Sequence, residues 1–144
     1  MNQLVEYDAQ DILSLDEASF KATIVQLILL KDTEKAVELV SRKFKVRAPS
    51  LGIGHTKGKK TALAVYSVAA NTISFSDQDQ YFNPFVVLHE MYHCVRSTSG
   101  HHRGTERNAD KFALDYIEEF NKKLIALGYG IPVETNSLTS VDDV

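Results

Sequence analysis

The sequence has a single cysteine, Cys94, among its 144 residues, so no disulfide framework can form within the chain. Long apolar runs are also missing: the longest, residues 23–30 (TIVQLILL), is far too short to span a bilayer. The first eleven residues, MNQLVEYDAQD, contain acids and lack the basic and then apolar start of a secretory signal. We therefore expect a reduced thiol, no membrane segment and a cytoplasmic location.

The amino-acid composition and net charge are those of an ordinary globular protein. Hydrophobic residues make up 44% and charged residues 24%, and the net charge of −3 demands neither nucleic acid nor a membrane as partner. No internal repeat or linker divides the chain, so we expect one domain over residues 1–144. Its ends, residues 1–15 and 131–144, should be loosely ordered, and nothing in the sequence specifies an oligomeric state.

Apolar periodicity predicts two helices in the N-terminal third. The first begins after Asp16, a good N-cap residue, and repeats apolar residues at steps of three and four. Its inner face is formed by Phe20, Ile24, Leu27 and Ile28. The stretch KDTEKAVELVSRKF (residues 31–44) either begins a second helix, capped by Asp32 or Thr33, or continues the first with a bend. Its inner face should carry Val37, Val40 and Phe44.

The middle of the chain predicts about three short strands. Residues 51–56 and 61–68 flank a turn at KGKK (57–60), and residues 71–76 alternate apolar and polar. Residues 77–84 should form a loop, after which Pro84 opens a helix over about 83–97. A last helix should run from about 105 to 127 and stop at Gly128 and Gly130. This pattern predicts an α+β fold in which N-terminal helices pack on a small mixed or antiparallel sheet.

The stretch VVLHEMYHCV (residues 86–95) places two histidines and a glutamate in an otherwise uncharged helix. Residues four apart lie one turn above each other, so His89 and His93 can direct their imidazoles at one metal ion, for which Zn²⁺ is the preferred candidate. Glu90 lies beside such a metal and can take a proton from its bound water. The alternative is that the histidines are satisfied core residues and the HExxH match is chance.

A hydrolytic zinc site needs a third protein ligand. The next predicted helix opens with GTERNADKFA, in which Glu106 and Asp110 share one face and Ala109 and Ala113 permit close helix packing. We predict Glu106 as the third ligand and Asp110 as the carboxylate that orients a ligand histidine. The alternative is a solvated acidic first turn that suits the helix dipole.

The combination of HEMYH and ERNADKFA resembles the gluzincin metallopeptidases, in particular minimal cytosolic forms such as the ImmA/IrrE-like proteins. The similarity covers residues 71–116, under a third of the chain. It implies a zincin-like fold, a protein or peptide substrate, and the same roles for His89, His93, Glu106, Glu90 and Asp110. It also implies that residues 71–76 form the strand that borders the cleft and pairs with substrate. Membrane spans of the HtpX type are absent. Only twelve residues separate His93 from Glu106, which is short for a gluzincin.

Two other readings remain open at this point. His101 or His102 in GHHRG could supply the third ligand, as in SprT-like proteases that act on DNA-crosslinked proteins. The same histidines could instead close the site with four protein ligands and make the domain a catalytically silent, zinc-stabilised binding or regulatory module.

Three further features of the sequence give weaker indications of function. A donor for the developing oxyanion could come from His101, His102, Arg103, Tyr92 or Tyr116. Cys94 is expected to be a buried small residue rather than a redox thiol. No acid occurs from residue 39 to 76, whereas seven bases do, and we interpret this basic block (residues 42–60) as a solvated face rather than a nucleic-acid site.

Overall fold

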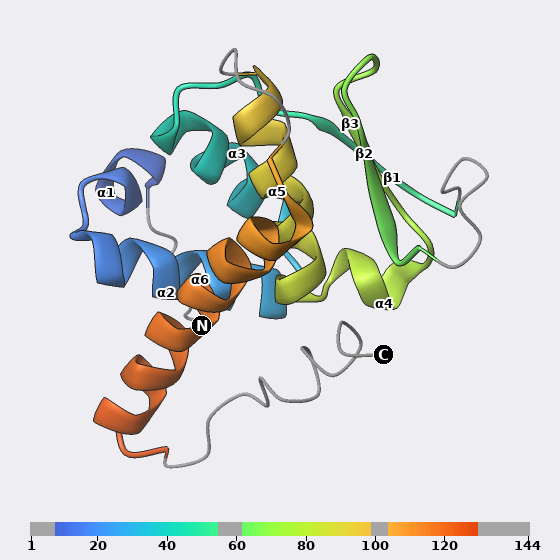
Figure 1. The fold of residues 1–144 in the computed structure, drawn as a ribbon. Coiled ribbons are helices and arrows are strands. Elements are labelled where there is room, and N and C mark those ends of the chain that lie inside the picture. The colour runs from blue at the N-terminus through green and yellow to red at the C-terminus, as the bar shows by residue number, and fades with distance from the viewer. Residues whose placement is uncertain (1–7, 55–61, 99–103, 130–144) are drawn as a thin grey trace.

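The computed structural model describes residues 8–54, 62–98 and 104–129. Those residues form an α+β arrangement of six helices and three strands (Figure 1). The elements follow one another as α1 (Ala9–Leu13), α2 (Glu17–Leu29), α3 (Thr33–Lys43), β1 (Ser50–Ile53), β2 (Ala64–Ser67), β3 (Thr72–Phe75), α4 (Gln78–Tyr81), α5 (Pro84–Thr98) and α6 (Glu106–Ala126). The α+β class predicted from the sequence is confirmed.

The first two predicted helices are present as separate elements. The Asp16 side chain accepts a hydrogen bond from the Ser19 backbone N–H at 2.8 Å and so caps α2. Lys31 closes that helix with a positive φ of 70°, so α3 begins anew at Thr33. The prediction that Phe44 lies on the inner face is wrong, because α3 ends at Lys43 and Phe44 is 41% exposed.

Two short helices occupy segments for which no regular structure was predicted. α1 lies within the expected lead-in of residues 1–15, and its Ile12 is 1% exposed. α4 lies within the expected loop of residues 77–84, where the Asp77 side chain accepts from the Gln80 N–H at 3.1 Å. Each has only four or five residues, which is too short for an apolar repeat to appear.

The sheet is mixed and has the strand order β1-β3-β2. β3 pairs in parallel with β1 and antiparallel with β2, and Ile73 lies opposite Leu51 on one side and Tyr66 on the other. The central place of β3 contradicts the expectation that residues 71–76 pair with substrate, because both edges of that strand are already hydrogen-bonded. The predicted turn at residues 57–60 lies outside the described residues.

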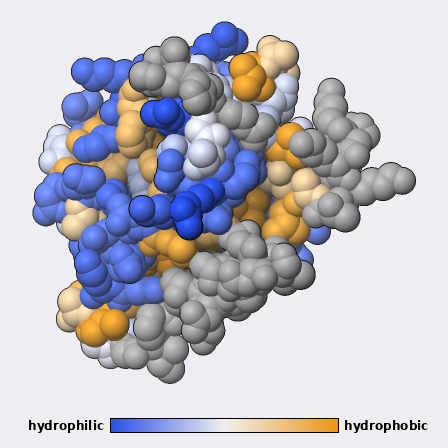
Figure 2. Space-filling view, in the orientation of Figure 1, coloured by the Kyte–Doolittle hydropathy of each residue, from blue (hydrophilic) through white to orange (hydrophobic). Residues whose placement is uncertain are grey.

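The core lies where α5 passes between the sheet and the helices α2, α3 and α6 (Figure 1). Ala109 and Ala113 of α6 are fully buried, and these small side chains let α6 approach α5 closely. Figure 2 shows mostly hydrophilic residues on the helical face of the molecule, with apolar residues reaching the surface in separate places. Across the three described segments, every helix is too short or too polar to cross a bilayer.

Candidate metal centre

α5 presents His89 and His93 of the HExxH motif toward one face. The helix starts at Pro84, and the Asn83 side chain accepts from the Phe85 N–H at 3.0 Å, which caps its first turn. The ring centroids of His89 and His93 lie 5.2 Å apart, as expected for residues one helical turn apart. The His93 side chain is fully buried and that of His89 is 14% exposed, so the protein holds both rings in a largely dry environment.

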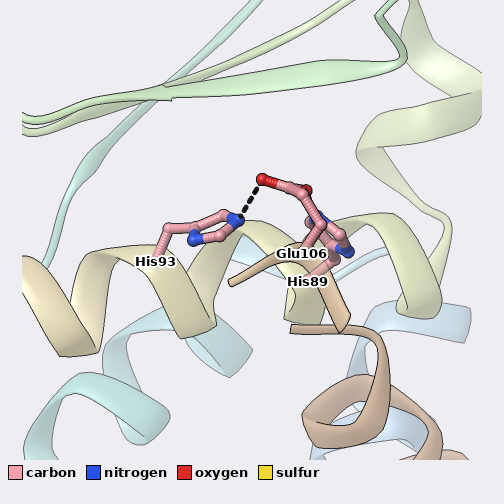
Figure 3. A group of neighbouring side chains, drawn as sticks. All are labelled: His89, His93 and Glu106. Carbon is pink, nitrogen blue, oxygen red and sulfur yellow. Dashed lines mark hydrogen bonds and ion pairs between the residues drawn. The ribbon is translucent and has the colours of Figure 1, made fainter. Parts of the chain in front are cut away.

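α6 brings Glu106 to the two histidines. The Thr105 side chain accepts from the Asn108 N–H at 3.1 Å and caps the helix, which makes Glu106 its first residue. One Glu106 carboxylate oxygen lies 2.7 Å from His89 Nε2 and the other lies 3.1 Å from His93 Nε2 (Figure 3). One candidate ligand atom from each of the three residues lies within 4.8 Å of the others. The structure therefore brings together the three residues that the sequence suggested as ligands.

Asp110 contacts the opposite edge of the His89 ring. It follows Glu106 by one helical turn, and its carboxylate lies 2.8 Å from His89 Nδ1. An ionised carboxylate can only accept a hydrogen bond, so Nδ1 carries the proton of this bond. The bond fixes the ring orientation and leaves Nε2 facing Glu106.

Glu90 lies beside this cluster rather than within it. Its side chain is 10% exposed, and one carboxylate oxygen is 4.0 Å from His89 Nε2. The grouping of possible ligands consists of His89, His93 and Glu106. Glu90 therefore lies next to the three possible ligands, one residue after the first histidine.

The pKa of the Glu106 carboxyl lies below its ordinary value. Partial burial raises this pKa, but when His89 and His93 are protonated, a hydrogen bond from His89 and the positive charges of both rings lower it by more. A carboxylate that remains charged near neutral pH is a suitable metal ligand.

The other sequence candidates separate into two groups. His101, His102 and Arg103 lie outside the described residues. Tyr116 is 2% exposed and lies ten residues beyond Glu106 on α6, about 15 Å along the helix axis. Tyr116 is therefore a core residue, and the prediction that it could donate to an oxyanion at this site is wrong. Burial raises the pKa of its hydroxyl.

Of the two residues that flank His93, Tyr92 is partly exposed and Cys94 is buried. The Tyr92 ring contacts the rings of His93 and Phe112, each with a centroid separation of 5.7 Å. Cys94 is fully buried, with its sulfur 3.6 Å from the Asn71 side-chain oxygen, and burial raises the pKa of the thiol. These contacts agree with the interpretation of Cys94 as a buried small residue.

A feature that the sequence interpretation missed is the close approach of Gly104 to Tyr92. Gly104 has a positive φ of 80°, and a Cβ atom built on it would lie 2.5 Å from Tyr92 Cε2. The sequence shows a glycine two residues before Glu106, but no local pattern indicates which residue it packs against. Its packing against a residue of α5 depends on the tertiary structure.

The described part of the basic block is exposed. Arg42 forms an ion pair with Glu38 at 2.7 Å, and the Lys43 ammonium lies 5.0 Å from the Phe20 ring centroid. Lys45 and Arg47 are exposed, whereas residues 57–60 lie outside the described segments. The exposure of these described positions is that expected of a solvated face.

Comparisons of the chain with models of known protein families, with curated proteins and with solved structures found no match.

Proposed function

We propose that this chain is a zinc-dependent metallopeptidase of the gluzincin type with a zincin-like fold. The observation that carries the proposal is the placement of the Glu106 carboxylate against Nε2 of both His89 and His93, with Asp110 behind His89. The donors come from two helices and are two imidazole nitrogens and one carboxylate oxygen. This is the ligand set of a hydrolytic zinc site that keeps one position for water or substrate.

The hydrogen-bonding pattern of His89 supports a bound cation. Because Asp110 accepts the Nδ1 proton, a neutral His89 ring turns a lone pair on Nε2 toward the Glu106 carboxylate 2.7 Å away. Two acceptors at that distance repel each other unless a proton or a metal ion lies between them. A divalent cation accepts electron pairs from both atoms and from His93, so the residues present fit a metal.

The roles of the chain's own residues follow from their positions. When bound, zinc would polarise the scissile carbonyl and lower the pKa of a water molecule. Glu90 would accept a proton from that water while the water oxygen forms a bond to the carbonyl carbon. Glu90 would then deliver the proton to the leaving nitrogen as the C–N bond breaks. Asp110 would keep the proton of His89 on Nδ1 throughout.

The sheet offers β2 as the strand that would align a peptide. In the described residues β2 is bonded to β3 on one side only, and it packs against α5, which carries the motif. The Ser76 N–H donates to the Leu63 carbonyl at 2.8 Å, so the backbone of Leu63 points toward β3. By the alternation of an antiparallel pair, the backbone groups of Ala64 and Tyr66 point toward the other edge. An extended peptide would pair there.

Hydrolysis of a fluorescence-quenched peptide library by the zinc-reconstituted chain tests this function. Glu90→Gln should retain zinc and the fold but lose turnover by at least two orders of magnitude, because the amide cannot accept the proton. Glu118→Gln, at an exposed position on α6, is the matched control and should be as active as the wild type. Equal hydrolysis by Glu90→Gln and the wild type would refute the mechanism.

A further inference from the structure

The connection between the two ligand-bearing helices is short. α5 ends at Thr98 and α6 begins at Glu106, so seven residues reverse the chain and deliver the carboxylate to the histidines. Thr105 and Gly104 are the last two of them, and both are described. A contact that sets the distance between Gly104 and α5 therefore also sets the distance between Glu106 and α5, because Glu106 follows only two residues later.

Gly104 lies directly on the ring of Tyr92. A Cβ atom added to it would lie 2.5 Å from Cε2, 2.7 Å from the hydroxyl oxygen and 2.9 Å from Cζ of Tyr92. Each of these separations is shorter than a real Cβ contact. The positive φ of 80° is a second reason for glycine here, because other residues seldom adopt that conformation.

The Tyr92 ring is itself held from both helices. It meets the His93 ring at an interplanar angle of 67° and the Phe112 ring at 51°. Phe112 in turn packs on Tyr116 with a centroid separation of 4.9 Å. Because these contacts restrict the Tyr92 ring, the backbone at Gly104 packs against a ring of fixed position.

We infer that the contact between Gly104 and the Tyr92 ring positions the third metal ligand, Glu106, relative to His93. This inference rests on the proposed zinc site and assigns two new residues to it. Tyr92 is adjacent to His93 in the chain, and Gly104 is two residues before Glu106, so one packing contact sets the separation of two ligands. Tyr92 acts here through its ring as a positioning residue, and its hydroxyl is not required.

The test is the dissociation constant for zinc, measured by competition with a chromophoric chelator below the melting temperature of each variant. Gly104→Ala should weaken binding about 10- to 100-fold, the range typical of lost ligand positioning. Gly128→Ala is the matched control, because Gly128 also has a positive φ, 91°, but nothing lies within 4 Å of its added Cβ. It shares the conformational cost without the steric clash and should bind zinc as the wild type does.

Two substitutions at Tyr92 separate the ring from the hydroxyl. Tyr92→Phe keeps Cε2 and Cζ and should bind zinc within about twofold of the wild type, whereas Tyr92→Ala removes the surface and should bind several-fold more weakly. The double variant Tyr92→Ala/Gly104→Ala should lose less than the product of the two single losses, because both act through one contact. Tyr92 is partly exposed, so its variants should fold, and they test the inference even if Gly104→Ala does not fold.

The absorption spectrum of the cobalt-substituted protein reports ligand geometry independently of affinity. It should change in Gly104→Ala and stay unchanged in Gly128→Ala and Tyr92→Phe. The inference is overturned if Gly104→Ala and Gly128→Ala have equal zinc affinity and equal cobalt spectra, or if Tyr92→Ala binds zinc as the wild type does. If zinc binding by the wild type depends on Glu106 but not on Gly104, only this inference fails. If the wild type binds no zinc, the proposed function fails with it.

Discussion

The hydrogen bond between Asp110 and His89 allows a quantitative prediction for Asp110→Ala. The Asp110 carboxylate lies 2.8 Å from His89 Nδ1, and its side chain is 22% exposed. A hydrogen bond to a charged group in such a partly dry place contributes about 1.5–3 kcal/mol. Loss of a carboxylate that orients a metal-bound histidine typically weakens metal affinity about 10- to 100-fold, or about 1.4–2.7 kcal/mol. The two ranges agree, so we expect zinc affinity to fall by one to two orders of magnitude.

A series at this position separates charge from orientation. In Asp110→Asn the amide oxygen can still accept the Nδ1 proton, so the loss of zinc affinity should be smaller than in Asp110→Ala. Asp115→Ala is the matched control, because Asp115 lies on the same helix, is exposed, and forms an ion pair with Lys21 away from the histidines. Its zinc affinity should equal that of the wild type.

Chelator competition at pH 7 measures all three variants. Equal zinc affinity of Asp110→Ala and Asp115→Ala would refute the orienting role of Asp110, because His89 would then be oriented without this carboxylate. A further check is the unfolding midpoint of each metal-free variant in urea, which separates a general loss of stability from a specific loss of metal affinity.

The other predictions concern three residues of the scaffold. Ile73→Ala, at a fully buried position in the central strand, should lower the free energy of unfolding in urea by about 2–5 kcal/mol, and a loss below 1 kcal/mol would contradict the central place of β3. Thr105→Ala should cost about 1 kcal/mol in the same assay through loss of the α6 cap, whereas an unchanged midpoint would show that the cap is not needed. Cys94 should resist a thiol reagent at pH 8 until the chain unfolds, because burial raises its pKa. Since the unfolded thiol ionises near pH 9.0 and the folded one only at higher pH, Cys94 should also lower stability as the pH rises above 9.0, and rapid native-state labelling would contradict this account.

Helical periodicity predicted α5 and α6 and showed which polar residues share a face within each helix, whereas their meeting across the two helices was a further hypothesis. His89 and His93 lie one turn apart on α5, as do Glu106 and Asp110 on α6, and buried alanines at 109 and 113 are where two helices approach closely. Local spacing therefore carries most of the information about the candidate site.

The remaining features depend on contacts between distant segments. The order of the strands cannot be read from alternation, so the central place of β3 was not predicted. Phe44 fits the repeat of α3, but the helix ends one residue earlier and the ring packs on Phe112 with a centroid separation of 5.8 Å. Similarly, Gly104 packs against the Tyr92 ring only because α6 folds back against α5, and the local sequence does not show this contact.

The metal stoichiometry of the purified chain after zinc reconstitution tests the central claim most directly. It should be measured for the wild type, for Glu106→Ala and for the double variant His101→Ala/His102→Ala. We predict one zinc per chain in the wild type and in the double variant, and loss of zinc in Glu106→Ala, because Glu106 supplies the third ligand. Zinc retained by Glu106→Ala, zinc lost with the two histidines, or no zinc in the wild type would contradict the proposed site.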